Sequence, residues 1–323
     1  MKHPIFFSIL LAACLATGCQ SHRYVVFSGY AQGGIYSVKA DLAGVRTPAK
    51  EIQAHIDALL DSIDFSLSGY NKNSLLTKYN RGEEIVPDRF FREVRALSER
   101  YRAETGGAFD VASAPLFDIW GFGFTSDSLP DPARVDAALL ACKEEKVLNF
   151  NAIAQGYSCD VVAAYLRGLG VENMLVDIGE IYCAGVNAAG RGWTIGVDNP
   201  VDDNVTPGQD MRGIWQSDGG ACGLVTSGNY RKFYIRDGRK YAHTIDPRTG
   251  YPVTHDLLSA TVVAPTAAEA DALATACMVL GPEGAKALIE GRPDLEGYLI
   301  MADGTWMSDG FRARAQLEDI PQK

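Results

Sequence analysis

The stretch LSATVVAPTAAEADALATAC, residues 258–277, decides the fold. Its first seven residues are rich in β-branched and small apolar side chains and predict a strand from Leu258 to Ala264. Thr266 and Glu269 then form a capping box, in which a Thr hydroxyl accepts the N–H of the residue three positions later. A helix therefore begins here and runs to about Leu280. A strand that passes directly into a helix indicates that the two kinds of element share one core.

The segments on either side repeat this mixture. Apolar and polar residues alternate in 24–30 and 35–42, which predicts a hairpin, and the next helix has Thr47 as N-cap and Pro48 at its first position. Further helices are expected from Arg89 to Gly106, from Asp131, from about Tyr157 to Leu169, and from Pro282. Strands are expected in 147–151, 174–178, 193–197, around 224, and in 231–235, 241–245, 298–301 and 305–307. We therefore expect an α+β fold of mixed, mainly antiparallel sheets packed with helices.

Composition narrows the classes of protein. The chain has 323 residues, 47% hydrophobic and 22% charged, with a formal net charge of −10. Such a chain buries a large core, and nothing groups its cations into a basic face, so nucleic acid is not an expected partner. No low-complexity linker or internal repeat divides it. Residues 19–323 are expected to form a single domain, in one or two lobes.

The first residues resemble an export signal. Lys2 precedes an apolar run from Pro4 to Leu15, which is too short to span a bilayer but has the length of a signal-peptide core. Small residues then lead to Cys19, as in a bacterial lipobox. We expect residues 1–18 to be removed and Cys19 to carry lipid, anchoring the protein to the extracytoplasmic face of the bacterial cell membrane. Lipidation at Cys14, or a cleaved signal without lipid, are the alternatives.

Five cysteines follow the leader, with no C-x-x-C spacing among them, which excludes a zinc knuckle and a thioredoxin-like motif. Cys159 and Cys277 lie in apolar helical stretches and are expected in the core. In an exported protein some of the others, Cys142, Cys183 and Cys222, can pair. The sequence leaves the pairing open.

The helix after residue 266 carries the first candidate site. Asp271 and Thr275 are four residues apart, so their oxygens project from the same face. A carboxylate and a hydroxyl suit a hard cation, Mg²⁺ before Zn²⁺. The alternative is an Asp that only favours the positive end of the helix dipole.

A second candidate lies in 243–252. The Asp-Pro-x-Thr-Gly sequence from Asp246 to Gly250 is typical of a tight turn, and His243 precedes it at the rim, where an imidazole can act as a base. The alternative is a turn with a surface histidine. No G-x-G-x-x-G or Walker A sequence is present, so neither a Rossmann nor a P-loop phosphate site is expected.

Taken together and in order, several segments resemble one family, the ApbE-type flavin transferases. They are residues 33–38, 68–71, 107–110, 115–116, 120–123, 149–157, 226–228, 243–252 and 270–276. The chain departs from the family pattern at Asn149, where many members have Asp, and at Gly179, where the family usually has two glycines.

The resemblance implies an α+β fold related to the T-fold with a cleft for FAD, and an enzyme that transfers FMN from FAD to a Thr or Ser hydroxyl of an acceptor protein, with release of AMP. It implies a Mg²⁺ site made by Asp271, Thr275 and the carbonyl groups of Ala152 and Ala274, and His243 as catalytic base. It places the FAD contacts at Gln32, Tyr70, Ala108, Phe109, Asp110, Asn149, Gln155 and Ile245. Tyr70 as an ordinary core aromatic is the alternative for that position.

The expected acceptors are membrane-bound or exported flavoproteins of electron transport, which agrees with a lipid anchor. Two other functions stay open from the sequence. One is a Mg²⁺-dependent FAD pyrophosphatase that yields FMN and AMP, with water in place of the acceptor hydroxyl. The other is a flavin-binding lipoprotein without catalysis.

Overall fold

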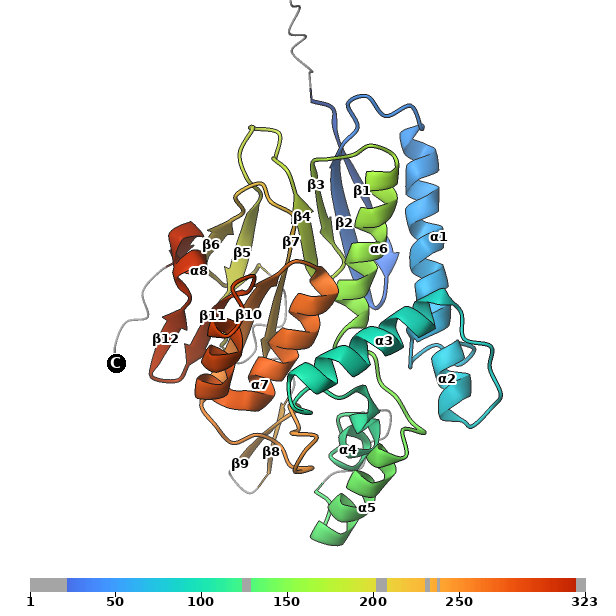
Figure 1. Cartoon of the computed structure of the whole chain (residues 1–323), viewed down its shortest axis with the longest axis vertical. Helices are drawn as coiled ribbons and strands as arrows, with labels where there is room; N and C mark the ends of the chain where they lie inside the picture. The colour runs from blue at the N-terminus through green and yellow to red at the C-terminus, as the bar shows by residue number, and fades with distance from the viewer. Residues whose placement is uncertain (1–21, 124–128, 202–207, 230–232, 237–238, 318–323) are drawn as a thin grey trace, which may run out of the picture.

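An eight-stranded sheet forms the centre of the protein (Figure 1). The structure is a computed structural model and describes residues 22–123, 129–201, 208–229, 233–236 and 239–317. The strands of this sheet, in spatial order, are β1 (Tyr24–Ala31), β2 (Gly34–Asp41), β3 (Met174–Asp177), β4 (Ile181–Ala184), β7 (Cys222–Gly228), β10 (Leu257–Ala264), β11 (Glu296–Met301) and β12 (Gly304–Met307). Each neighbouring pair is antiparallel.

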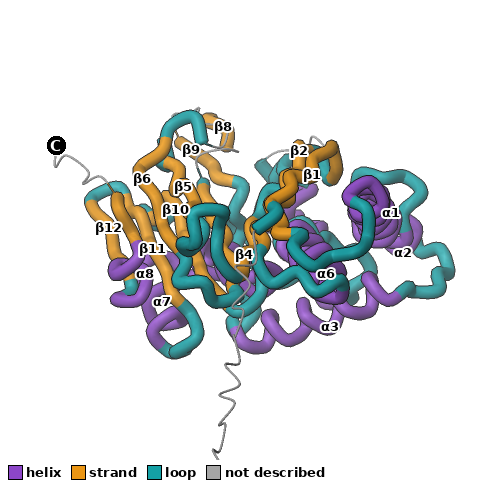
Figure 2. The backbone as a smooth tube through the Cα atoms, turned by 90° about the horizontal axis from the view of Figure 1, so that it is seen from above, coloured by secondary structure: helices purple, strands orange, loops and turns teal. Residues whose placement is uncertain are grey.

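Helices cover one face of this sheet. α1, α6 and α7 lie on the strands, and α3 crosses below them (Figures 1 and 2). The helices are α1 (Ala49–Leu67), α2 (Leu75–Asn80), α3 (Arg89–Glu104), α4 (Ala114–Ile119), α5 (Pro132–Lys143), α6 (Ala154–Gly168), α7 (Ala267–Glu290) and α8 (Asp309–Arg314), with a short 3-10 turn, η1 (Val111–Ser113).

A smaller sheet covers the other face. It contains β13 (Ala315–Leu317), β6 (Met211–Gln216) and β5 (Thr194–Asp198) in that order. Strand residues alternate between the two sides, as the period of two requires: Val225 packs with the helices, while Leu224 packs with Trp215 and Phe311 beneath the smaller sheet. The central strands are thus buried on both faces. A two-stranded ribbon, β8 (Phe233–Arg236) with β9 (Arg239–Ala242), stands apart.

Helix α7 is long and apolar enough to cross a membrane by length and composition. Its packing against β7, β10 and α6 identifies it instead as a core helix. Gly281, at a φ of 73°, interrupts it with a kink just before Pro282. Two helical segments that meet there agree with the expected start of a helix at Pro282.

The α+β fold and its antiparallel sheets are as predicted, with several local differences. Residues 147–151 form no strand; Leu148 and Phe150 are buried there in irregular backbone. Pro48, not Thr47, is the N-cap of α1, and α6 begins three residues before Tyr157. In the capping box Thr266 accepts the N–H of Glu269, but the Glu269 carboxylate pairs with Arg292.

Candidate functional site

Asp271 lies in the second turn of α7, where it faces the start of α6. Its side chain is 4% exposed, so it is more deeply buried than a residue at the wall of an open cleft. Its Oδ2 accepts the backbone N–H of Gly156 at 3.1 Å. Burial raises its pKa to about 7, and the nearby Asp160 carboxylate acts in the same direction. A carboxylate so placed is stabilised in its ionised form by a cation.

Gly156 makes this contact possible. A Cβ atom at this position would lie 2.3 Å from the carbonyl oxygen of Ala267, so only glycine lets α6 approach α7 this closely. The same approach brings the loop before α6, which contains Ala152, against the first turns of α7. The close packing of two helix starts therefore positions the predicted metal ligands.

Thr275 follows Asp271 by one turn and is half-buried. Its Oγ1 lies 3.5 Å from the Oγ of Ser227, at the end of β7. Ala274 beside it is fully buried, and Ala152 is half-buried. The structure thus brings two hydroxyls and one carboxylate to the junction of α7, β7 and α6, an all-oxygen set of the type that Mg²⁺ prefers. No group of three or more His, Cys, Asp or Glu side chains suited to a metal occurs among the described residues.

His243 lies in the segment after β9. Thr244, its neighbour, donates from Oγ1 to the Oδ1 of Asn229 at 2.5 Å, and both residues are buried. Because Asn229 follows β7 directly, this bond holds the histidine segment next to the end of the strand that carries Ser227. The half-buried imidazole also contacts the Phe122 ring edge to face, with centroids 6.4 Å apart.

The turn after His243 forms as predicted. Asp246 accepts the N–H of Arg248 at 2.9 Å and also pairs with its guanidinium, and Gly250 closes the turn at a φ of 82°. Ile245 is fully buried against Leu116 and Trp120. Its side chain therefore belongs to the core, and only its backbone is suited to contact a ligand.

Gln155 lies in the first turn of α6, and Gln32 contacts the start of this helix from another element. Gln32 occupies the turn between β1 and β2 at a φ of 51° and donates to the Oγ of Ser158 at 2.5 Å. Its Oε1 is buried and has no hydrogen-bond partner in the described part of the chain. Gln155 donates to the carbonyl of Ile178 at 3.3 Å. The unsatisfied oxygen of Gln32 is suited to accept a donor from a ligand.

The remaining predicted FAD contacts gather around the loop after α3. Ala108 and Phe109 are buried, and Asp110 accepts the N–H of Ala112 at 2.8 Å. The N–H of Asn149 donates to the carbonyl of Val111 at 2.8 Å, which joins the loop before α6 to this one. Burial raises the pKa of Asp110.

Tyr70 is 69% exposed, which excludes the core alternative for this ring. Its hydroxyl accepts from the Nδ2 of Asn151 at 3.2 Å, and the N–H of Asn151 donates to the Oδ1 of Asn149 at 2.9 Å. An exposed ring is thereby tied to the loop that precedes α6, where its face is accessible for stacking.

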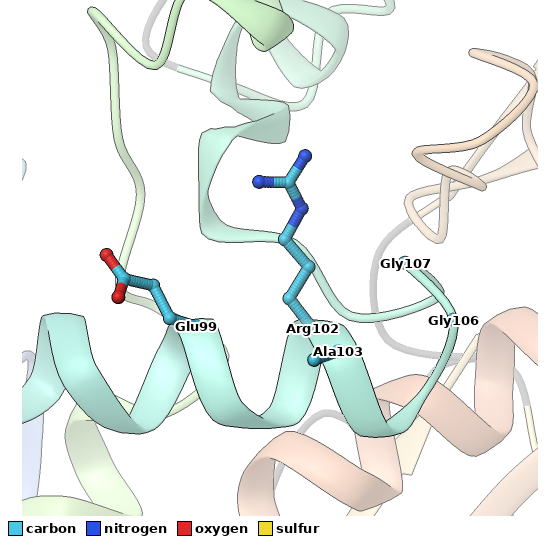
Figure 3. Close-up of a pocket in the computed structure, with 5 residues that line it drawn as sticks. All are labelled: Glu99, Arg102, Ala103, Gly106 and Gly107. Atoms are coloured by element: carbon cyan, nitrogen blue, oxygen red, sulfur yellow. The ribbon is translucent and has the colours of Figure 1, made fainter.

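A hollow of about 460 Å³ opens beside the end of α3 and the loop that follows it. It is lined by Glu99, Arg102, Ala103, Gly106 and Gly107 (Figure 3). Arg102 extends from α3 toward it and forms an ion pair with Asp110, Nε to Oδ2 at 3.0 Å. The hollow therefore has a cation at its wall.

Three residues of this region were missed from the sequence. Arg102 stands in the last turn of α3, just before a predicted glycine loop, and that position was the available signal. Asn151 lies inside the segment 149–157 but had been assigned only to a strand end. Asp160 accepts the N–H groups of Ala267 at 2.8 Å and Ala268 at 2.9 Å, capping α7 from α6. No local sequence pattern reveals a cap that comes from another helix.

Among models of known protein families, that of the ApbE family matches residues 33–299 of this chain. The chain belongs to the ApbE family. Among its relatives, the FAD:protein FMN transferase of Salmonella typhimurium is 32% identical, over 94% of this chain and 95% of the relative. The FAD:protein FMN transferase of Escherichia coli K12 is 31% identical, over 95% and 96%.

Solved structures of the ApbE family have the same fold. The flavin transferase ApbE from Vibrio cholerae superposes with a TM-score of 0.76 at 30% identity, covering 91% of this chain and 99% of its own. The flavinyl transferase ApbE of Pseudomonas stutzeri, in its apo form, gives a TM-score of 0.77 at 30% identity, over 91% and 97%. The resemblance noted in the sequence is confirmed at the level of family and fold.

Proposed function

We propose that the protein transfers FMN from FAD to a Thr or Ser hydroxyl of an acceptor flavoprotein and releases AMP. The observation that carries this proposal is the junction of α6, α7 and β7, where Asp271, Thr275 and Ser227 converge in a member of the ApbE family. In the reaction, the acceptor oxygen bonds to the phosphorus of the FMN half. The bond from that phosphorus to the bridging oxygen breaks, and AMP leaves.

Mg²⁺ fits the residues present. Asp271, Thr275 and the carbonyl groups of Ala152 and Ala274 would hold it, and the burial that raises the pKa of Asp271 favours a positive partner for its carboxylate. When bound, the ion supplies charge stabilisation to the pyrophosphate and to the leaving phosphate. The chain itself has a net charge of −10, so local neutralisation of an anionic substrate requires such a group.

FAD fits the groups that surround this junction. The unsatisfied Oε1 of Gln32 can accept a donor from the flavin or the adenine, and the exposed face of Tyr70 can stack on either ring. Arg102 lines the hollow after α3 with its guanidinium paired to Asp110 and Glu145, so it orients Asp110 at this site. His243 takes the proton of the acceptor hydroxyl, because an alcohol is a poor nucleophile without a base.

We also propose that the mature protein begins at lipidated Cys19, anchored to the extracytoplasmic face of the membrane. Cys19 lies outside the described residues. An exported enzyme of this kind would act on membrane-bound or exported flavoproteins of electron transport.

The decisive experiment incubates the protein with FAD, MgCl₂ and a candidate acceptor and follows in-gel flavin fluorescence after denaturation. A fluorescent acceptor band, together with one AMP per flavin attached, supports the transferase. The control is the same acceptor protein with its target Thr or Ser replaced by Ala. Free FMN and AMP in equal amounts without a labelled acceptor would instead identify a pyrophosphatase, and FAD that stays intact would identify a binding protein.

A further inference from the structure

Two cysteines face each other across neighbouring central strands. Cys183 in β4 and Cys222 in β7 are direct partners in the antiparallel register. Their Sγ atoms are 3.6 Å apart. A disulfide needs about 2.05 Å between its sulfur atoms, so a shift of roughly 1.5 Å closes the gap without moving the strands apart.

The other three cysteines after the leader lie in parts of the core other than the one that contains Cys183 and Cys222. Cys142, Cys159 and Cys277 belong to three separate hydrophobic clusters, whereas Cys183 and Cys222 share the one beneath the smaller sheet. Cys183 is buried there among residues such as Trp193 and Leu224, and Cys222 is partly buried at the edge of the same cluster. The pairing that the sequence left open is therefore restricted to one combination within the fold.

We propose that Cys183 and Cys222 form a disulfide bond that ties β4 to β7. In the cell this rests on the export proposed above, because exported compartments are oxidising and cytosolic thiols stay reduced. The bond closes a loop that contains β5 and β6, so it holds the two ends of that loop together in the central sheet.

The chemistry is a thiol–disulfide exchange with an external disulfide, either a thiol oxidase of the exported compartment or oxidised glutathione. One thiolate attacks a sulfur of the donor and releases its first thiol. The second protein thiolate then attacks the mixed disulfide, which forms the Cys183–Cys222 bond and releases the second thiol. The two protein S–H groups lose their protons and two electrons, and the donor disulfide is reduced to two thiols.

Cys222 is the thiol that an external donor reaches first, because it is partly exposed while Cys183 is buried. The two sulfur atoms are in contact, and either can be the hydrogen-bond donor. This contact lowers the pKa of Cys183 and raises that of Cys222. Once Cys222 is joined to the donor, Cys183 is placed to attack the mixed disulfide and complete the bond.

The bond should act on stability and leave catalysis nearly unchanged. Cys222 begins β7 and Ser227 lies near its other end, roughly 16 Å away along the strand. Cross-linking a loop of about 40 residues restricts the unfolded chain, and in a protein of this size its reduction should lower Tm by roughly 3 to 8 °C. Flavin transfer at room temperature should stay close to that of the oxidised protein.

The test uses the full-length chain, expressed with its own leader and purified from membranes without reductant. Free thiols are blocked with iodoacetamide, and peptides are mapped by mass spectrometry before and after reduction. In parallel, the same chain purified under reducing conditions is treated with oxidised glutathione. Thermal unfolding is followed with and without dithiothreitol in the wild type, in Cys183→Ala/Cys222→Ala, and in Cys142→Ala as a buried-thiol control.

We expect a peptide pair linked through Cys183 and Cys222, with a Tm that dithiothreitol lowers in the wild type and in Cys142→Ala but not in the double variant. If the double variant fails to fold, the peptide map and the wild-type response still decide. A bond that forms only with glutathione would support the pair and contradict export. Alkylation of both thiols in both preparations, or a link from either one to another cysteine, would overturn the proposal.

Discussion

At the scale of single residues, Asp271 is the group whose environment is most costly without a partner. Its carboxylate is buried, and burial raises its pKa to about 7. Removal of the charge should therefore not destabilise the metal-free protein, whereas it should remove the principal ligand of a cation. These two expectations distinguish a metal ligand from a residue whose only role is to accept the N–H of Gly156 at the start of α6.

We predict that Asp271→Asn abolishes flavin transfer and eliminates the rise in Tm that MgCl₂ produces in the wild type, with an unchanged or higher Tm in EDTA. Differential scanning fluorimetry and binding of Mn²⁺ measured by electron paramagnetic resonance check this. Thr275→Val is the graded companion, with weaker binding of the metal and partial activity, since water can replace one neutral ligand. A normal response to Mg²⁺ in Asp271→Asn would contradict the assignment.

For His243 we predict that replacement by Ala leaves FAD affinity nearly unchanged and lowers single-turnover transfer by roughly 10² to 10⁴, the usual contribution of a general base. FAD fluorescence titration and quenched-flow transfer on the same variant measure both quantities. Thr244→Val is the matched control, because it breaks the bond to Asn229 while the imidazole stays. If His243→Ala lost affinity for FAD and kept its chemical rate, the histidine would only brace the turn.

At the scale of elements, Asp160 of α6 caps the start of α7 and so links the two helices. Its two carboxylate oxygens accept the first N–H groups of α7, and an amide would present a donor to one of them. We predict that Asp160→Asn loses about 1 to 3 kcal/mol of stability and also lowers transfer, because α7 carries Asp271 and Thr275.

Asp131→Ala provides the control for this effect. Asp131 caps α5 through the N–H of Arg134 at 2.9 Å and, among the described residues, makes no hydrogen bond or ion pair with α7. Its replacement by Ala should lose about 1 kcal/mol in urea unfolding, the usual contribution of an N-cap, while transfer stays at the wild-type rate. Equal losses of transfer in both variants would show that general destabilisation, and not the position of α7, is responsible.

A histidine at the kink of α7 makes the stability of the folded protein depend on pH. His255 packs beneath Gly281, its Nε2 donates to the Met278 carbonyl at 2.9 Å, and its Nδ1 accepts the N–H of Leu257 at 3.3 Å. Burial lowers its pKa, an effect that outweighs the neighbouring carboxylate of Asp256. The unfolded chain therefore binds the proton more readily, and this part of the stability is present above about pH 6.5 and is lost as pH falls below it.

We predict that the free energy of unfolding of the wild type decreases more between pH 7.5 and pH 5.5 than that of His255→Gln, whose amide can donate to Met278 but does not titrate. Urea denaturation at the two pH values measures the difference. Parallel pH profiles of the two proteins would show that His255 contributes nothing to it.

The sequence predicted elements where the signal is local and failed where it is not. The hairpin after Tyr24, the helix ending at Gly106 and the kink before Pro282 rest on turn and cap residues in the chain itself. By contrast β4 and β6 were missed. β4 has only four residues, three of them buried, and β6, with the sequence MRGIWQ, shows no regular alternation of apolar and polar residues. The segment 147–151 has the composition of a strand, but the Asn149 N–H binds Val111 instead of a sheet.

The residues of the candidate site were likewise predicted only where the signal lies in the local sequence. Asp271 and Thr275 were singled out because they share a helix face, His243 because it precedes a tight turn, and Tyr70 and Gln32 from the resemblance to a family. Arg102 and Asp160 act through contacts between elements, which one sequence does not encode locally. The roles of these residues as ligands and base stay predictions.

At the scale of the whole molecule, the proposed location at the membrane depends on the thiol of Cys19, which lies outside the described residues. We predict that Cys19→Ser moves the protein from the membrane fraction to the soluble fraction, because the acyl chains supply the affinity for the bilayer. Immunoblotting of fractionated cells checks this, with Cys14→Ser as the matched control. Membrane association that is lost only in Cys14→Ser would place the lipid on that residue.

The strand order also determines when each part of the chain can fold. From β3 onward, the strands of the central sheet pair in the order in which they are synthesised, so this half can assemble progressively. The β1–β2 hairpin is made first, yet β2 pairs with β3, whose first residue, Met174, is made only after all of α1 to α6. Closing so long a loop is slow. Until β3 has been made, the edge of β2 has no partner strand. An unpaired strand edge can pair with another chain, so we expect aggregation, and a need for a chaperone, at this stage of folding.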